Sequence, residues 1–233
     1  MRRIKRLSTN YYFFDIITAF FVTVLLISNI ASSKITTFGF FTLDAGTILF
    51  PLTYIIGDSL TEVYGFSRTR RVIWVGFMCN VLMIPIFLIV GTLPASPDWP
   101  YQDAYNSILG VTPRIIIASM IAYLIGEFSN AFILAKIKLI TKGKYLWFRT
   151  IGSTLIGQFL DTIIFIIVAF TGIFPTPVLM SLIVSNYIFK VLVEIVFTPI
   201  TYVLINQLKR IEHVDHYDDK TNFNPFTLES KNE

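Results

Sequence analysis

Ionisable and amide side chains occur in pairs inside stretches of this sequence that are otherwise apolar. The two members of each pair are three or four residues apart and therefore share one face of a helix: Asp58 with Glu62, Glu127 with Asn130, Gln158 with Asp161, and Lys190 with Glu194. An ionisable side chain inside a membrane span is costly, and it usually faces a cavity or an oppositely charged partner. The spacing therefore predicts a polar site that binds a solute inside a membrane protein.

The remaining residues give little support for catalysis. Both histidines, His213 and His216, lie in the polar C-terminal segment, and the single cysteine, Cys79, excludes an internal disulfide and a four-ligand zinc site. The chain has no Gly-x-x-x-x-Gly-Lys-Ser/Thr phosphate loop. An aspartyl dyad of Asp58 and Asp161 would not stand in a recognised protease motif. We predict a protein that is not an enzyme and that uses no cofactor and no metal.

The composition indicates that these residues are carried by membrane-spanning helices. Of 233 residues, 54% are hydrophobic and 15% are charged, whereas a soluble chain averages about 25% charged residues. A span needs about 20 apolar residues, and six segments qualify: residues 12–31, 46–64, 72–93, 112–136, 150–172 and 178–206. We predict an all-α integral membrane protein, a bundle of six transmembrane helices. Residues 1–11 would form a basic N-terminus, 12–206 the transmembrane domain, and 207–233 a polar, flexible tail.

The basic residues predict the orientation of this bundle. With the N-terminus in the cytoplasm, 16 of the 19 Lys and Arg residues lie inside, two lie outside, and Lys190 lies within a span. Basic residues accumulate on the cytoplasmic side of membrane proteins, so the asymmetry predicts that both termini are cytoplasmic and explains the positive charge without nucleic acid. A cleavable signal peptide over residues 1–31 is the alternative, but cleavage would leave five spans and place the tail on the opposite side.

Four of the polar residues fall at one depth. At about 1.5 Å per residue, Asp58 and Lys190 lie roughly 18 Å from the outer ends of their segments, and Glu127 roughly 20 Å. Gln158 lies roughly 12 Å from the inner end of its segment, so all four fall near the midplane of an apolar core about 30 Å thick. Glu62 lies closer to the cytoplasmic rim. Polar groups from several helices at one level are expected of a transporter site.

A purely structural role is the competing interpretation. Lys190 could pair with Asp161 or Glu194, and Arg149 with Glu62 at the inner rim, so that each pair only fixes helix packing. One packing pair would not require four carboxylates and two amides, which favours a site. Near the outer end of the first segment, Asn29 and Lys34 could belong to a gate, although Lys34 could equally extend to the membrane interface.

A short pattern recurs in three of the segments. Residues 56–61, 125–130 and 156–161 all read Ile-Gly, then an acid or amide, then two residues and a polar side chain. The glycine would allow close approach of helices, so the pattern favours a shared polar seam.

Two longer motifs resemble a known family. Phe50-Pro-Leu-Thr-Tyr-Ile-Ile-Gly-Asp58 runs into Leu60-Thr-Glu-Val-Tyr-Gly65, and Trp147-Phe-Arg-Thr-Ile-Gly-Ser-Thr154 follows later. Both resemble the bacterial queuosine precursor transporters, once described as a vitamin uptake family. Shorter matches bring the resemblance to residues 12–206: Ser28-Asn29-Ile30, Lys34, Ala45-Gly46-Thr47, Gly157-Gln158, Asp161-Thr162, Lys190 and Thr198-Pro199.

The resemblance implies a multi-pass importer in the bacterial inner membrane. Its architecture would be similar to the substrate-binding subunits of energy-coupling-factor transporters. Its substrate would be a 7-deazapurine: 7-cyano- or 7-aminomethyl-7-deazaguanine, or the queuine base. The sequence does not decide whether two copies of the chain form a homodimer.

The chemistry of a deazaguanine agrees with the polar residues. Its ring N–H and exocyclic amine can donate to a carboxylate, and its carbonyl can accept from an amide. We expect the substrate-binding residues to be Asp58, Glu127, Asn130, Gln158, Asp161, Lys190, Phe50 and Tyr54. The residues expected in gating or ion pairs are Asn29, Lys34, Glu62, Arg149 and Glu194.

Two other hypotheses are compatible with the sequence. The chain could be the substrate-binding subunit of an ATP-driven uptake complex, which is compatible with the missing phosphate loop. It could also be a membrane-embedded enzyme or a scaffold. The sequence does not decide which precursor is preferred or what drives its accumulation.

Overall fold

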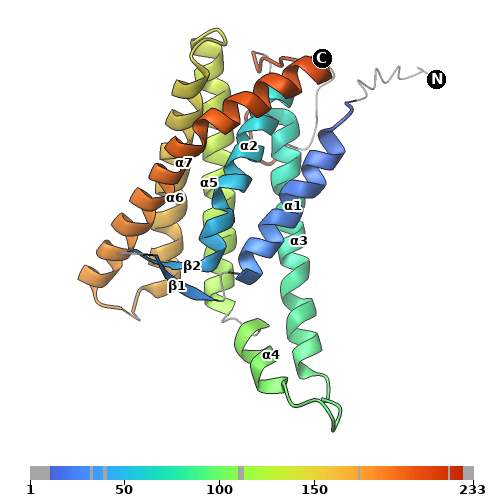
Figure 1. The fold of residues 1–233 in the computed structure, drawn as a ribbon, viewed down its shortest axis with the longest axis vertical. Helices are drawn as coiled ribbons and strands as arrows, with labels where there is room; N and C mark the ends of the chain where they lie inside the picture. Colours follow the sequence, from blue (N-terminus) through green and yellow to red (C-terminus); the bar gives the residue numbers. More distant parts are fainter. Residues whose placement is uncertain are drawn as a thin grey trace, which may run out of the picture.

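The computed structural model describes residues 11–31, 34–38, 41–109, 113–172, 174–219 and 221–227. These residues form a bundle of α-helices (Figure 1). In chain order the elements are α1 (Phe14–Ala31), β1 (Ile35–Phe38), β2 (Phe41–Asp44), a 3-10 helix η1 (Ala45–Leu49), α2 (Phe50–Tyr64), α3 (Phe66–Thr92), α4 (Gln102–Leu109), α5 (Pro113–Ile140), α6 (Leu146–Phe170) and α7 (Thr176–Glu212). The prediction of an all-α architecture is confirmed, apart from one short hairpin.

Five helical segments are long and apolar enough to cross a membrane. They are Phe14–Ala31, Phe66–Thr92, Ile117–Ile140, Leu146–Phe170 and Thr176–Glu212. Large apolar side chains on their outer faces are exposed, including Val75, Ile121, Phe159 and Val196. Exposed apolar surface of this extent is expected where lipid, rather than water, surrounds a protein.

The remaining predicted span, residues 46–64, is different from the others. It consists of η1 followed by α2, and α2 alone has 15 residues. Helix α2 contacts α1, α3, α5 and α7, and every residue from Thr53 to Tyr64 is buried. This short helix is therefore the centre of the bundle, enclosed by longer helices.

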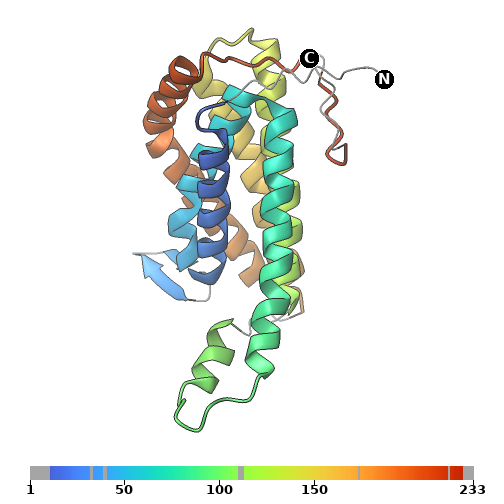
Figure 2. The same cartoon turned by 90° about the vertical axis from the view of Figure 1, so that its right-hand side faces the viewer.

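The two ends of the bundle differ. At one end, α1 begins and α7 finishes, and we call it the terminal end (Figures 1 and 2). The carboxylate of Glu212 in the last turn of α7 accepts hydrogen bonds from the backbone N–H groups of Tyr12 (2.9 Å) and Phe13 (2.8 Å), which joins α7 to the start of α1. The antiparallel β1–β2 hairpin and the short helix α4 lie toward the opposite end.

Helices α5 and α6 approach each other very closely through glycines. A Cβ added at Gly126 would lie 2.9 Å from the Cβ of Asp161, and one added at Gly157 would lie 2.9 Å from the Cβ of Asn130. The two positions are equivalent in the Ile-Gly pattern found in the sequence. The pattern thus marks a reciprocal helix contact, which brings the polar residues that follow each glycine against the neighbouring helix.

The chain beyond α7 packs back onto the bundle. The side chain of Asp218 accepts hydrogen bonds from the backbone N–H of Phe66 at 3.0 and 3.1 Å. The guanidinium of Arg70 donates to the carbonyl oxygens of Asn222 (2.8 Å) and Asn224 (2.7 Å). Figure 2 shows this segment crossing the terminal end toward α3. Residues 213–219 and 221–227 therefore differ from the solvated tail expected from composition, because buried donors of α3 find their hydrogen-bond acceptors in this segment.

Candidate functional site

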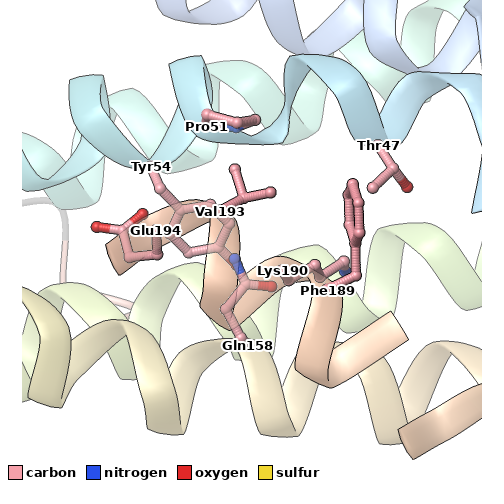
Figure 3. A pocket seen from close by; sticks show the side chains of 8 residues that line it. All are labelled: Thr47, Pro51, Tyr54, Gln158, Phe189, Lys190, Val193 and Glu194. Atoms are coloured by element: carbon pink, nitrogen blue, oxygen red, sulfur yellow. The ribbon is translucent and has the colours of Figure 1, made fainter. Parts of the chain in front are cut away.

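A small cavity lies between η1, α2, α6 and α7 (Figure 3). Its volume is about 10 Å³, roughly the room for one water molecule. The residues that line it combine a short polar set with apolar and aromatic groups: Thr47, Pro51, Tyr54, Gln158, Phe189, Lys190, Val193 and Glu194. Binding sites for small molecules have linings of this mixed kind, but a cavity of this volume admits nothing larger than water.

Two polar side chains of the cavity wall have buried oxygens with no hydrogen-bond partner among the described residues. They are Oε1 of Gln158 on α6 and Oε1 of Glu194 on α7, whose residues are 2% and 4% exposed. Figure 3 shows both side chains beside the Tyr54 ring, which comes from α2. A buried polar atom without a partner costs free energy, and in a native protein it requires an explanation such as a ligand or a water.

More such atoms lie on the faces that adjoin the cavity. Asp58 is fully buried, and its Oδ1 accepts a hydrogen bond from Nδ2 of Asn130 at 2.8 Å. The other carboxylate oxygen of Asp58 and the amide oxygen of Asn130 have no partner. The hydroxyls of Thr154 and Thr162, one turn on either side of Gln158, also have none. The interior of the bundle is therefore rich in hydrogen-bonding capacity that the described residues do not satisfy.

One ion pair lies at the edge of the cavity. Nζ of Lys190 on α7 is 2.8 Å from Oδ2 of Asp161 on α6. We use the name polar layer for the set formed by Asp58, Glu127, Asn130, Gln158, Asp161, Lys190 and Glu194. It holds four carboxyl groups and one ammonium group, drawn from α2, α5, α6 and α7.

A second group of buried charges lies at the terminal end. The Glu62 carboxylate on α2 is 2.6 Å from Nη2 of Arg149, 2.6 Å from Nζ of Lys209 and 3.4 Å from Nζ of Lys138. Asp215, beyond α7, contacts the same two lysines at 2.6 and 2.8 Å. We call these five residues the terminal charge cluster. They join α2, α5, α6, α7 and the C-terminal segment, so they close the bundle at this end.

The charge of Asp215 is held by its partners. Partial burial acts to raise the pKa of the Asp215 carboxyl, but hydrogen bonds from Lys138 and Lys209 outweigh burial and bring the pKa below its usual range. Asp215 is therefore ionised at neutral pH. It provides Lys138 and Lys209 with a second negative charge in addition to that of Glu62.

Comparison with known proteins decides the family. The family described as "Putative vitamin uptake transporter" matches this chain over residues 44–204, a stretch that contains the whole polar layer and most of the terminal charge cluster. The chain belongs to this family.

Two relatives from this comparison carry functional names. A "Probable queuosine precursor transporter" of Bacillus subtilis (strain 168) is 32% identical over 165 residues, which cover 69% of this chain and 71% of that protein. A "Queuosine precursor transporter" of Escherichia coli (strain K12) is 28% identical over 170 residues, covering 70% and 73%. No solved structure matches the chain, so the likeness to energy-coupling-factor subunits stays a prediction. Family membership makes this chain a transport protein rather than an enzyme, in a multi-pass membrane fold.

Within this family fold, the predicted binding residues divide into two groups. Tyr54, Gln158 and Lys190 line the cavity, and so does Glu194, which is expected from the sequence in gating or an ion pair. Asp58, Glu127, Asn130 and Asp161 belong to the polar layer but do not line the cavity. The side chain of Phe50 lies outside the part of the chain that the structure describes.

The residues expected in gating or ion pairs also occupy different places. Glu62 and Arg149 form the core of the terminal charge cluster. Asn29 donates a hydrogen bond from Nδ2 to Oδ1 of Asn80 at 2.5 Å, which links α1 to α3. Lys34 is exposed beside the hairpin.

Sequence reasoning did not single out several residues that the structure brings to these sites. Thr47 and Phe189 line the cavity, and Lys138, Lys209 and Asp215 belong to the terminal charge cluster. A signal existed for two of them, because Thr47 lies in a motif of the family and Phe189 precedes Lys190. The others resemble ordinary basic or acidic residues near the ends of helices.

Proposed function

We propose that this chain imports queuosine precursors, the deazaguanines or queuine, and binds each in an enlarged form of the closed cavity. The observation that supports this most directly is the set of buried oxygens without partners around that cavity, on Gln158, Glu194, Asp58 and Asn130. The substrate class comes from the names of the two relatives, extended to this chain because they share its family and about 70% of its length.

The cavity wall carries groups that complement a deazaguanine. The Glu194 carboxylate can accept the ring N–H and the exocyclic amine, and the Gln158 amide can donate to the ring carbonyl. The aromatic rings of Tyr54 and Phe189 line the cavity, and a flat heterocycle stacks on rings of this kind. The cavity thus offers recognition of the polar edge and of the faces of one small bicyclic molecule.

Transport requires a change of conformation, because the closed cavity is too small. An engineered protein cavity of about 150 Å³ holds benzene, and a deazapurine is larger, whereas this cavity measures about 10 Å³. Helix α7 must therefore move relative to α2 and α6 for a substrate to enter. We infer alternating access, in which a midplane site opens to one side at a time.

The proposed topology has six spans, with η1 and α2 as the short central one and with both termini in the cytoplasm of a bacterial cell. The terminal charge cluster then lies on the cytoplasmic side and acts as the inner gate. In the closed conformation Glu62 and Arg149 hold α2 against α6, and release of the substrate requires this contact to open.

A transport assay with purified protein tests the proposal. Proteoliposomes that contain only this chain should take up labelled 7-cyano-7-deazaguanine, and unlabelled deazaguanines should compete with it. Gln158→Ala should lower uptake by about tenfold or more, since a hydrogen bond in a dry site is lost. Asp103→Asn, an exposed carboxyl-to-amide change on α4, is the control and should transport as the wild type does.

The same assay distinguishes a transporter that works alone from a subunit of an ATP-driven complex. If uptake requires a nucleotide and additional subunits, the chain is the substrate-binding subunit of an ATP-driven complex. If no deazapurine is bound or transported under either condition, the substrate class is wrong.

A further inference from the structure

The charges of the polar layer do not balance in the described part of the chain. Of its four carboxyl groups, Asp161 pairs with the one ammonium group, Lys190. Among the described residues, no Lys, Arg or His nitrogen lies within 4.0 Å of the carboxyl oxygens of Asp58, Glu127 or Glu194. These three residues are 0%, 6% and 4% exposed, so water does not solvate them either.

The three carboxyl groups are also close to one another. Oε2 of Glu127 on α5 reaches α2 beside Gly57, where an added Cβ would lie 3.4 Å away, and Asp58 is the next residue along α2. One turn after Glu127, Asn130 binds Asp58 directly. Glu194 of α7 lies beside the Tyr54 ring, and Tyr54 is one turn before Asp58 on α2. Glu194 in turn lies in the cavity wall.

The surroundings of this group supply little positive charge. Helix α6 contributes Asp161, and Tyr54 lies on α2 itself; Glu62, one turn from Asp58, is occupied by its own three cations. On the α3 side, the neighbouring ionisable groups are the Tyr123 hydroxyl of α5 and the Cys79 thiol. Helix α1 has one acidic residue, Asp15, in its first turn, far from this depth.

Three negative charges cannot remain together in such a place. An ion taken out of water costs several kcal/mol even after the protein relaxes, unless a counter-charge compensates for it. A carboxyl group that has bound a proton is neutral and carries no such cost. The closed conformation is therefore balanced when these groups hold protons, and buried acidic residues of this kind form the proton relays of many membrane transporters.

We propose that Asp58 and Glu127, linked to the cavity through Glu194, form a proton-binding site that couples import of the substrate to proton entry. A carboxylate accepts H⁺ from the outer side when the cavity opens there, and the resulting carboxylic acid releases H⁺ when the cavity opens inward. No other bond forms or breaks. The proximity of Asp58 and Glu194 means that a substrate bound at Glu194 changes how readily the neighbouring carboxyls keep their protons.

A proton fits this site better than a metal cation does. Hard metal cations such as calcium and magnesium are bound by several oxygen ligands that converge on one point. Among the described residues, no group of three or more Asp, Glu, His or Cys side chains converges in a way that could hold a metal ion. A proton needs only one carboxyl oxygen.

The test is substrate uptake into proteoliposomes under defined ion gradients, with 7-cyano-7-deazaguanine as the probe and a pH-sensitive dye in the external medium. With an inside-alkaline gradient of one pH unit, each coupled proton should concentrate the substrate by about tenfold. Without an imposed gradient, adding substrate should make the medium more alkaline. Accumulation driven by sodium instead, or uptake with no movement of protons, would overturn the inference.

Two conservative variants locate the site. Asp58→Asn and Glu127→Gln keep size and hydrogen bonding but cannot exchange a proton, so each should lose accumulation driven by the pH gradient and the alkalinisation of the medium. Both should show wild-type thermal stability in detergent, and Asp103→Asn should behave as the wild type in every assay. Accumulation at the wild-type level in both variants would contradict the assignment.

This inference rests on the proposed function, and the assay distinguishes the two failures. Absence of all uptake by the wild type contradicts transport itself. Uptake that is insensitive to the pH gradient leaves transport intact and contradicts only the coupling.

Discussion

Asp58 and Glu62 lie one turn apart on the same central helix, and both are completely buried, yet their environments are opposite. Glu62 contacts Arg149, Lys209 and Lys138. Asp58 has one amide partner and one oxygen with none. The protein therefore compensates buried charge fully at one level of α2 and leaves it uncompensated at the next.

The difference separates two functions of buried polar groups. A carboxylate whose hydrogen bonds are all filled by the protein fixes a conformation, because every partner would be lost on opening. A carboxyl with unused hydrogen-bonding capacity stabilises a conformation less and can bind a ligand reversibly, which in our proposals is a substrate or a proton. The terminal charge cluster thus suits a gate, and the polar layer suits a site.

The largest effect on stability should follow from removing the carboxylate at the level where buried charge is compensated, that of Glu62. Glu62→Gln removes the carboxylate and leaves the buried Arg149 and Lys138 without it; the loss of one member of a buried ion pair costs about 3–5 kcal/mol. The midpoint of thermal unfolding in detergent should fall strongly. Asp58→Asn is the matched control, the same kind of change one turn away, and should shift the midpoint little because no cation loses its partner. Equal losses in the two variants would remove the distinction between the levels.

The compensated level was the less visible of the two in the sequence. Apolar segments, polar pairs and glycines indicated the helices and the polar layer, because residues three or four apart must share a helix face. The terminal charge cluster depends on Lys138, Lys209 and Asp215, which are 76 and more residues from Glu62 along the chain. Nothing local indicates that Lys209 and Asp215 would be brought to it.

Neither the docking of the C-terminal segment nor the size of the cavity could be predicted from the sequence, for related reasons. Composition predicted solvation for residues 207–233, but Phe66 and Arg70 at the start of α3 donate hydrogen bonds to Asp218 and Asn222 within that stretch. The spacing of polar residues indicated which side chains share a helix face, whereas the small volume of the cavity depends on how α7 packs against α2 and α6. Packing between helices decides both.

A smaller effect, of the opposite sign, should appear at the uncompensated level. Thr162→Val keeps the shape of a side chain whose buried hydroxyl has no partner, so the folded protein loses a desolvation cost of about 1 kcal/mol or more. The variant should unfold at a higher temperature than the wild type. Its transport should be slower, since a site that is better satisfied without substrate opens less readily.

Thr150→Val provides the contrast for that result. The hydroxyl of Thr150, on the same helix near the terminal end, donates to the carbonyl oxygens of Leu146 and Trp147 at 3.2 Å, so its removal should be neutral or destabilising. Stabilisation by both changes would mean that valine simply suits α6, and that the unpartnered hydroxyl of Thr162 has no special meaning.

The smallest effect should come from the exposed edge of the terminal charge cluster, and it should depend on pH. The side chain of Asp215 is 43% exposed, and pairs of this kind contribute about 0.2–1 kcal/mol each. Because its pKa is lower in the folded protein than in the unfolded chain, its contribution is present above the unfolded value of about 3.9 and is lost as the pH falls through the folded value. Docking of the C-terminal segment should therefore weaken only below about pH 4.

The indole N–H of Trp74 donates to the carbonyl oxygen of Pro225 at 2.8 Å, so the fluorescence of Trp74, obtained as the difference from Trp74→Phe, reports this docking. In Asp215→Asn the signal should already be weakened at pH 7 and should change less on acidification than in the wild type. A signal that is equally strong in the variant at pH 7 would show that Asp218 and the backbone contacts hold the segment by themselves, and that Asp215 contributes nothing to closing the bundle.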